Sequence, residues 1–244
     1  MREYIHRFYR RETRAEGLVS FQVKMKESDL FIWAQRDLRA QALQSLLRHR
    51  FQLEEFISRQ PPFGTSFLPC EVPGDAPDIV QRMARAASRA GVGPMAAVAG
   101  AVAEMVGRDL LPLSPELMVE NGGDIFLCTC KERRIGIFAG ESPLSGRLAL
   151  VVGPTPPEGL GICTSSATVG PSYSAGAADA ALVVAESASL ADAAATALGN
   201  RAKSPGDMEE ALCLVVGLEG VLGCLLIMGE RLGAMGDLRL ERAG

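Results

Sequence analysis

Aromatic and histidine residues are scarce in this chain of 244 residues. Phe, Tyr and Trp make up 5% of the sequence, and the only histidines are His6 and His49. Because large rings are few, we expect the many alanines and glycines to fill the core through close approach of backbones. Both histidines are remote in sequence from any serine motif, which disfavours a Ser-His-Asp hydrolase.

The sequence also lacks a hydrophobic run of the kind that membranes or export require. Its first ten residues alternate charged with apolar side chains, so they contain no apolar signal-peptide region. The most hydrophobic stretch, Ala211–Gly229, holds Glu219 and is interrupted by glycines, whereas a membrane helix needs about 20 predominantly apolar residues. We therefore predict a cytoplasmic protein with no membrane partner.

Charge and cysteine usage argue against a nucleic-acid-binding protein and against a zinc protein. A formal net charge of −4 argues against nucleic acid as the main partner. No cysteine belongs to a CxxC pair, and zinc-type spacing is absent, so we expect reduced and mostly buried thiols. The cysteines are Cys70, Cys128, Cys130, Cys163, Cys213 and Cys224.

Hydrophobic periodicity predicts interleaved strands and helices. Expected helices span 37–59, 78–90, 94–107 and 189–198, the last closed by Gly199-Asn200. Expected strands span 3–9, 17–25, 29–34, 117–120, 125–130, 134–138, 147–152, 162–168, 180–185, 221–228 and 238–241. We expect hairpins to pair 125–130 with 134–138 and 221–228 with 238–241. Predominant hairpins favour an α+β fold, mostly antiparallel, over a doubly wound parallel sheet.

The chain is predicted to form a single domain over 1–244. The Pro/Gly-rich segment 61–77 is its only candidate boundary between subdomains. Nothing in the sequence fixes the oligomeric state, and assembly as a homo-oligomer is compatible with it.

Asn121-Gly122-Gly123-Asp124 follows a short apolar strand. Two glycines allow positive φ angles and let a ligand approach backbone amides closely, while the flanking Asn and Asp supply polar groups. A tight type I′ hairpin turn explains the same residues equally well. The motif alone does not decide between turn and site.

Asp192 and Thr196 are four residues apart, so on a helix they share one face. A carboxylate and a hydroxyl placed in this way can hold a hard cation such as Mg²⁺. The structural alternative is a capping box, in which Ser189 is the N-cap and Asp192 the N3 residue. Spacing alone favours the cap.

A run of hydroxyl side chains lies between these two motifs. Without a nearby histidine to activate a serine, these hydroxyls fit the lining of a phosphate or ribose pocket better than a nucleophile. A solvent-exposed loop is the alternative. The residues are Thr164, Ser165, Ser166, Ser172 and Ser174.

Taken in order, three segments carry a family resemblance. Val119–Ile125 (VENGGDI), Thr164-Ser165 and Ala191–Ala197 (ADAAATA) together resemble the ApbE-like superfamily, whose characterised members are FAD:protein FMN transferases. The segments Val92–Gly100 and Gly161–Asn200 look closer still to an uncharacterised, non-secreted branch of that superfamily. The likeness to this branch covers nearly the whole chain, and the match to true transferases covers about residues 85–240.

The resemblance implies an ApbE-like fold and particular roles for these residues. Asp192 and Thr196 become candidate Mg²⁺ ligands. The implied ligand is FAD, a related flavin or another small phosphorylated molecule, and the ligand-facing set becomes Asn121, Gly122, Gly123, Asp124, Thr164, Ser165, Ser166 and Ser174.

The chain also departs from the transferase pattern. Where transferases have Lys-Gly followed four residues later by Asp, this chain has Ala99-Gly100 followed by Glu104. The flavin-contacting histidine after the Thr-Ser motif is missing too. Two hypotheses remain: a Mg²⁺-dependent flavin or nucleotidyl transferase, or a ligand-binding or scaffold protein that kept the fold and lost the reaction.

Overall fold

The computed structural model describes residues 17–166 and 176–243, and all structural statements below concern these residues. An eight-stranded sheet forms its centre, in the order β1-β2-β3-β4-β7-β8-β9-β10. Every neighbouring pair in it is antiparallel. Its strands are β1 (Val19–Met25), β2 (Ser28–Ala34), β3 (Leu117–Asn121), β4 (Asp124–Cys128), β7 (Leu160–Ser165), β8 (Ala180–Ala185), β9 (Val221–Met228) and β10 (Arg231–Gly236).

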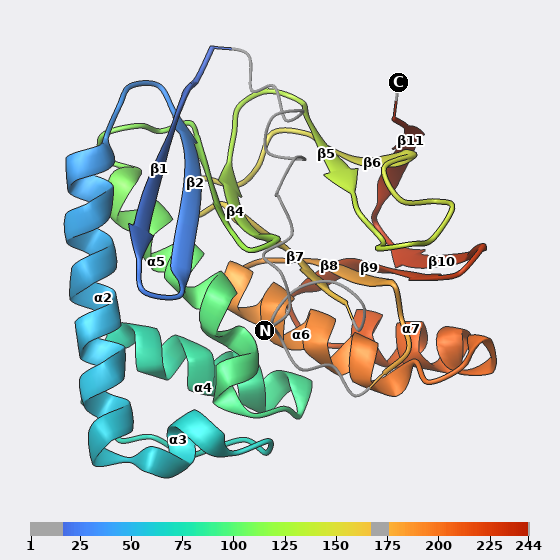
Figure 1. The fold of residues 1–244 in the computed structure, drawn as a ribbon, viewed down its shortest axis with the longest axis horizontal. Helices are drawn as coiled ribbons and strands as arrows, with labels where there is room; N and C mark the ends of the chain where they lie inside the picture. The colour runs from blue at the N-terminus through green and yellow to red at the C-terminus, as the bar shows by residue number, and fades with distance from the viewer. Residues whose placement is uncertain (1–16, 167–175, 244) are drawn as a thin grey trace.

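A smaller antiparallel sheet of three strands, in the order β11-β6-β5, covers one face of the large one. Its strands are β5 (Arg133–Ile137), β6 (Leu148–Val152) and β11 (Arg239–Arg242). In Figure 1, β7 to β10 lie between this small sheet and helices α6 and α7. The molecule is thus built in three layers, with an α+β fold.

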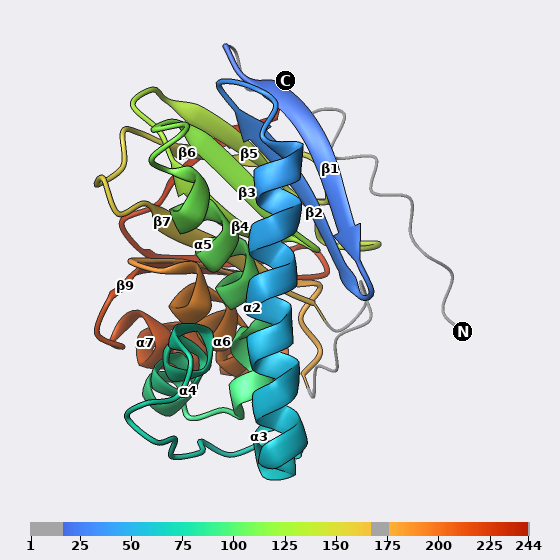
Figure 2. The same cartoon turned by 90° about the vertical axis from the view of Figure 1, so that its left-hand side faces the viewer.

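Helices cover the opposite face of the large sheet. Helix α2 runs beside β1 and β2 (Figure 2), and α5 and α6 pack on the strands at the centre of the sheet. The helical elements are α2 (Arg39–Arg59), α3 (Pro61–Thr65), α4 (Asp78–Ala90), the 3₁₀ turn η1 (Pro94–Ala97), α5 (Val98–Leu110), α6 (Ala188–Arg201), the 3₁₀ turn η2 (Pro205–Asp207) and α7 (Met208–Val216).

Side-chain alternation along the central strands produces two separate cores. Phe126, Cys163 and Val183 belong to the core under the helices. Their strand neighbours Ile162 and Leu182 belong to the core between the two sheets. Because successive residues of a strand point to opposite faces, a strand buried on both sides reads as one continuous apolar run. Strand β8, buried at all six positions, is of this kind.

Both predicted hairpins are wrong in their partners. Strand β4 pairs with β3 and β7, while β5 belongs to the small sheet and pairs with β6. Likewise, β9 forms its hairpin with β10, a strand the sequence reading treated as a loop. The final strand β11 crosses to the small sheet to pair with β6. The predicted strand 3–9 lies outside the described residues.

Two helix predictions also need correction. The last long helix does not end at Gly199-Asn200 but continues to Arg201. Helix α7 was not predicted, because its last six residues, from Ala211 to Val216, belong to the apolar stretch that begins at Ala211. Pro94 does occupy the first position of a helical turn, as expected.

No single helix in the described part of the chain has the length and apolar character to cross a membrane. Helix α4 and the helical run 94–110 reach that length and apolar character only when they are counted together, and they meet at a bend of 105°.

Candidate functional site

Strands β3 and β4 are joined by the Asn121–Asp124 motif. Gly122 and Gly123 have φ angles of 73° and 110°, and Asn121 pairs with Asp124 across the hairpin. The N–H of Gly123 donates to the buried Glu120 carboxylate at 2.8 Å. The turn reading is therefore confirmed. A turn of this kind still places the Asn121 and Asp124 side chains at the end of the sheet, beneath the helices.

Two glycines bring helix α6 unusually close to its neighbours. A Cβ atom on Gly100 of α5 would lie 2.1 Å from the carbonyl oxygen of Ala188, and one on Gly161 of β7 would lie 2.3 Å from that of Ser187. These contacts are with backbone, which cannot rotate away as a side chain can. The start of α6 is thus fixed against both α5 and β7, and this fixes the position of Asp192.

The Asp192 carboxylate ties α6 to α5. Its Oδ2 accepts the N–H of Gly100 at 2.8 Å, and the Asn121 amide donates to the neighbouring Ala99 carbonyl at 3.1 Å. The same short stretch of α5 therefore contacts both the ADxxxT helix and the turn motif. Residues more than 70 positions apart in sequence meet here.

The capping-box interpretation of Asp192 is wrong. The N-cap of α6 is Ser187, whose side chain accepts the N–H of Leu190. Asp192 lies beyond the first turn of the helix, where the backbone N–H groups already have intrahelical acceptors. Its carboxylate is directed at another helix instead.

The pKa shifts link Asp192 with two further residues, Asp124 and Cys163. Burial of its carboxylate oxygens and the nearby carboxylate of Asp124 raise the pKa of Asp192 well above its ordinary value, although N–H groups of Gly100 and Ala99 oppose the shift. Burial, Asp124 and Asp192 likewise raise the pKa of the Cys163 thiol. Two carboxylates and a thiol thus share one buried spot between β4, β7 and α6, and the carboxylates repel each other.

The predicted hydroxyl residues do not all lie on the same face of the sheet. Alternation along β7 puts Ser165 on the helix-covered face with Cys163, and Thr164 on the other face with Ile162. The Thr164 carbonyl nevertheless borders the turn, 4.0 Å from where a Cβ on Gly123 would be. Ser166 directly follows the strand, whereas Ser172 and Ser174 lie outside the described residues.

Thr196 is half-buried and lies one turn beyond Asp192 on α6. No group of three His, Cys, Asp or Glu side chains that could hold a metal ion occurs within 17–166 and 176–243. The donors near Asp192 are of a different kind: two carboxylates, a threonine hydroxyl and backbone carbonyls. Such all-oxygen donors suit Mg²⁺, which retains several of its waters, and a cation would relieve the repulsion between the carboxylates.

Sequence reasoning did not identify the residues that hold this arrangement together. Gly100 and Gly161 act by lacking a side chain, and Cys163 was read only as a core residue. A glycine in the interior of a helix is normally unfavourable, so Gly100 was the one available signal of a close helix contact.

The family relationship follows from sequence comparison. A family model described as "AbpE bacteria" matches residues 10–211. A UPF0280 protein of Methanocella arvoryzae is 43% identical over 216 residues, which is 88% of this chain and 87% of that protein. The chain therefore belongs to the family of the UPF0280 proteins, which the matching family model also covers. A UPF0280 protein of Methanosarcina acetivorans is 38% identical over 90% of this chain and 88% of its own length.

Solved structures show which fold the UPF0280 chain shares. The apo form of Pseudomonas stutzeri flavinyl transferase ApbE superposes with a TM-score of 0.59 at 14% identity, covering 90% of this chain and 94% of that one. The ApbE protein of Thermotoga maritima gives a TM-score of 0.57 at 10% identity, with coverage of 88% and 96%. At such low identity the likeness establishes the ApbE fold and nothing finer.

Proposed function

We propose that this UPF0280 chain binds a flavin or another phosphorylated nucleotide-like ligand together with Mg²⁺, at the site formed by Asn121–Asp124, Thr164–Ser166 and Asp192–Thr196. The observation that carries the proposal is that neighbouring residues of α5 contact both motifs, since Gly100 donates to Asp192 at 2.8 Å and Ala99 accepts from Asn121 at 3.1 Å. The carboxylate of Asp124 is close enough to raise the pKa of Asp192, and a bound cation would offset the repulsion between the two groups.

Each group has a role in this proposal. Asp192 supplies an anionic ligand to the metal, held in place by the N–H of Gly100 at 2.8 Å. Thr196 supplies a neutral oxygen from the next turn. The Gly122-Gly123 turn lets a ligand approach the backbone closely, and Asn121 and Asp124 orient it. Bound Mg²⁺ would neutralise charge on the phosphate oxygens of the ligand.

The proposed ligand class draws on the fold. The Pseudomonas stutzeri protein with this fold is a flavinyl transferase, and so is that of Vibrio cholerae. Ligand position is often retained within a fold while the chemistry changes. A flavin is therefore the first ligand to test.

A second candidate function is ligand binding without transfer. One observation favours it: Ala99 stands where the transferases have lysine, and its carbonyl accepts a hydrogen bond from Asn121. An alanine offers no charged side chain to a phosphate or to a reacting hydroxyl. Incubation of the protein with FAD, Mg²⁺ and a protein that offers acceptor hydroxyls separates the two functions, because AMP is the leaving group when FMN passes from FAD to an acceptor hydroxyl.

Calorimetric titration with FAD, with and without Mg²⁺, tests the binding proposal. Binding is expected to require Mg²⁺ and to be lost in Asp192→Asn, because a hard cation requires the anionic oxygen. Thr196→Val preserves shape while removing the hydroxyl, and should weaken binding.

Asp179→Asn is the matched control. Asp179 also accepts a glycine N–H, from Gly229 at 2.7 Å, but it is not part of the proposed site. It should bind as the wild type does. Unchanged Mg²⁺-dependent binding in both Asp192→Asn and Thr196→Val would show that the metal site is assigned to the wrong residues.

A further inference from the structure

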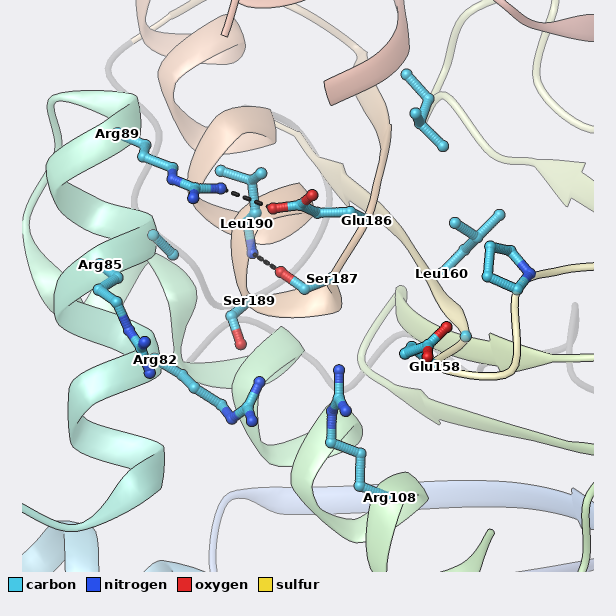
Figure 3. A pocket seen from close by; sticks show the side chains of 14 residues that line it. Arg82, Arg85, Arg89, Arg108, Glu158, Leu160, Glu186, Ser187, Ser189 and Leu190 are labelled. Carbon is cyan, nitrogen blue, oxygen red and sulfur yellow. Dashed lines mark hydrogen bonds and ion pairs between the residues drawn. The ribbon is translucent and has the colours of Figure 1, made fainter. Parts of the chain in front are cut away.

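A cavity of about 520 Å³ lies beside the start of α6, lined by α4, α5, the segment 156–160 and the residues around Ser187. Four of its lining residues are arginines. Arg82, Arg85 and Arg89 come from α4 and Arg108 from α5, and Figure 3 shows them on one side of the cavity, facing Glu158 and Leu160 on the other. This surface is separate from the carboxylate pair at Asp192.

The arginine wall is held by rigid elements. Arg82, Arg85 and Arg89 follow one another at helical spacings of three and four, so they share one face of α4. The opposite face of that helix is buried, including Ile79 and Met83 at 0% exposure. A ligand that bound these side chains would therefore meet groups already gathered by the fold, which lowers the entropic cost of binding.

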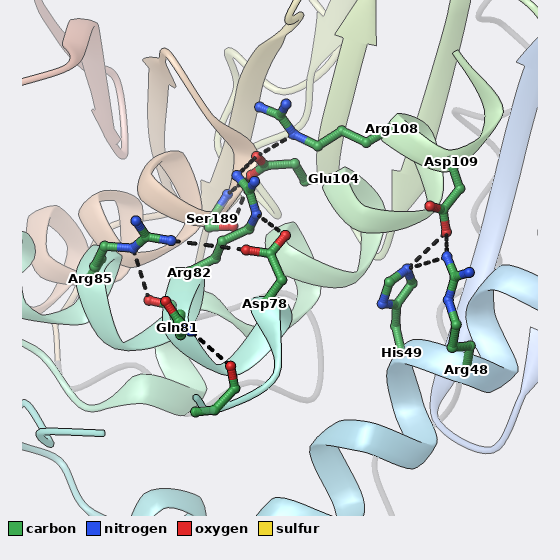
Figure 4. Close-up of polar contacts among 11 residues, drawn as sticks. Arg48, His49, Asp78, Gln81, Arg82, Arg85, Glu104, Arg108, Asp109 and Ser189 are labelled. Carbon is green, nitrogen blue, oxygen red and sulfur yellow. Dashed lines mark hydrogen bonds and ion pairs between the residues drawn. The ribbon is translucent and has the colours of Figure 1, made fainter. Parts of the chain in front are cut away.

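The lining of the cavity is rich in arginine although the protein is acidic. It holds four arginines against two glutamates, Glu158 and Glu186, while the whole chain has a net charge of −4. Asp78 and Glu104, which are outside the lining, pair with Arg82, Arg85 and Arg108 (Figure 4), so the charges around the cavity balance.

These ion pairs leave much of the arginine donor capacity unused. A guanidinium has five N–H donors. Arg108 uses its Nε on Glu104 at 2.9 Å, and Arg89 uses one terminal nitrogen, on Glu186 at 2.7 Å and the Glu219 carbonyl at 3.5 Å. Neither terminal nitrogen of Arg108 has a hydrogen-bond partner among the described residues. In Figure 3 this end of the side chain points toward the cavity.

The start of α6 is not itself the anion receptor. The N–H of Ser189 donates to Glu104 at 3.1 Å, and that of Leu190 donates to Ser187 at 3.3 Å. These amides are occupied, so recognition must come from the guanidiniums. Arginine is the side chain best matched to phosphate, because its planar fork donates two parallel hydrogen bonds.

The wall opposite the arginines defines the rest of the ligand. Pro156, Leu160 and Leu222 present apolar surface to the same cavity. We propose that this cavity is a second binding site, which takes a small organic phosphate with its phosphate on the arginines and its apolar part against Leu160 and Leu222. This inference does not depend on the function proposed for Asp192.

Calorimetric titration of the full-length protein at low salt tests the site, with inorganic phosphate and phenyl phosphate as probes. The double variant Arg85→Gln/Arg89→Gln should weaken both probes, by about tenfold for each guanidinium removed. The buried Glu104 is bound by Arg82 and Arg108, which the variant retains, so the variant should fold. Leu222→Glu, at a partly exposed position of the wall, should weaken binding by repulsion.

Two controls make the outcome decisive. Arg59→Gln removes an exposed arginine of α2 that pairs with Glu55, outside the cavity, and should not change the affinity. Asp192→Asn should also bind phosphate normally, which keeps this result distinct from that of the metal site.

Tighter binding of phenyl phosphate than of inorganic phosphate identifies an organic phosphate as the ligand, and equal affinity identifies free phosphate. Absence of saturable binding, or equal losses in Arg59→Gln and the double variant, would overturn the proposal.

Discussion

Two carboxylates, one half-buried and one fully buried, lie one turn apart along the contact between α5 and α6, in opposite electrostatic surroundings. Asp192 of α6 accepts the N–H of Gly100 from α5 and faces the carboxylate of Asp124. Glu104 of α5 accepts both the N–H and the hydroxyl of Ser189 from α6. It faces Arg82 and Arg108, at 3.0 and 2.9 Å.

The difference separates a structural group from a functional candidate. Glu104 is fully buried, yet its charge and its acceptor capacity are satisfied within the protein. Asp192 accepts its hydrogen bond, but within residues 17–166 and 176–243 its carboxylate forms no ion pair. Proteins retain an uncompensated buried charge mainly where a ligand or a metal completes the site. The four predictions below test this contrast, beginning with the largest expected effect.

Glu104→Ala should cost about 3–5 kcal/mol in the free energy of unfolding, because it removes one partner from a buried ion-pair network. Urea denaturation measures the loss. Asp78→Ala is the matched control, since Asp78 pairs with the same Arg82 at 3.0 Å but its side chain is 52% exposed. It should cost less than about 1 kcal/mol. Equal effects would mean that burial of Glu104 does not distinguish its role.

Gly100→Ala should destabilise the protein by about 1–3 kcal/mol, the usual range for overpacking. The added Cβ would lie 2.1 Å from the Ala188 carbonyl oxygen, so the helices must separate, and Mg²⁺-dependent binding at Asp192 should weaken with them. Gly153→Ala is the control, because nothing lies within 4 Å of its Cβ position. Chemical denaturation and calorimetry on both variants provide the check, and an unaltered stability of Gly100→Ala would contradict the close packing.

The sequence anticipated the parts of this comparison that depend on local pattern. Asn121-Gly122-Gly123-Asp124 was recognisable as a turn because two successive glycines accept positive φ. The four-residue spacing of Asp192 and Thr196 was enough to place them on one helix face. The α+β class followed from the expected predominance of antiparallel hairpins, and it holds although both named pairings were wrong.

What could not be predicted depends on contacts between distant segments. The reading of β4 and β5 as a hairpin assumed that neighbours in sequence pair in space, whereas the loop between them carries the chain into the other sheet. The sequence prediction placed the N-cap of this helix at Ser189, whereas the helix begins two residues earlier with Ser187 as its N-cap. The arginines of α4 drew no prediction from the sequence, because the opposite wall of their cavity comes from the distant residues 156–160.

A second carboxylate that is paired within the protein, Glu116, makes stability depend on pH. Burial acts to raise the pKa of Glu116, but hydrogen bonds from Arg133, Thr129 and Cys130 outweigh it and lower this pKa below its ordinary value. The folded state therefore binds fewer protons there than the unfolded state. The resulting stability is present above the unfolded pKa of about 4.3 and is lost as the pH falls through the folded pKa.

Glu116→Gln should accordingly reduce stability at pH 7 by about 1–2 kcal/mol, the contribution of a charge-assisted hydrogen bond. The difference from the wild type should disappear in acid, below the folded pKa. Denaturation curves of both proteins, recorded from pH 7 down to acid, measure this difference in the free energy of unfolding. A constant difference across this range would show that the Glu116 charge is not the source of the stability.

Asp192→Asn is the sharpest test of the contrast, although its effect on stability should be the smallest. The amide keeps an oxygen to accept the Gly100 N–H and removes the charge that faces Asp124. Without Mg²⁺ the variant should gain on the order of 1 kcal/mol, the Coulomb repulsion of two unit charges in contact in water. The control Asp179→Asn, which has only the Gly229 hydrogen bond, should gain nothing. Thermal and urea denaturation in chelator give both values, and adding Mg²⁺ should stabilise the wild type but not Asp192→Asn. A clear loss of stability in metal-free Asp192→Asn would mean that this carboxylate is structural, as Glu104 is, and would remove the main argument for a metal at this position.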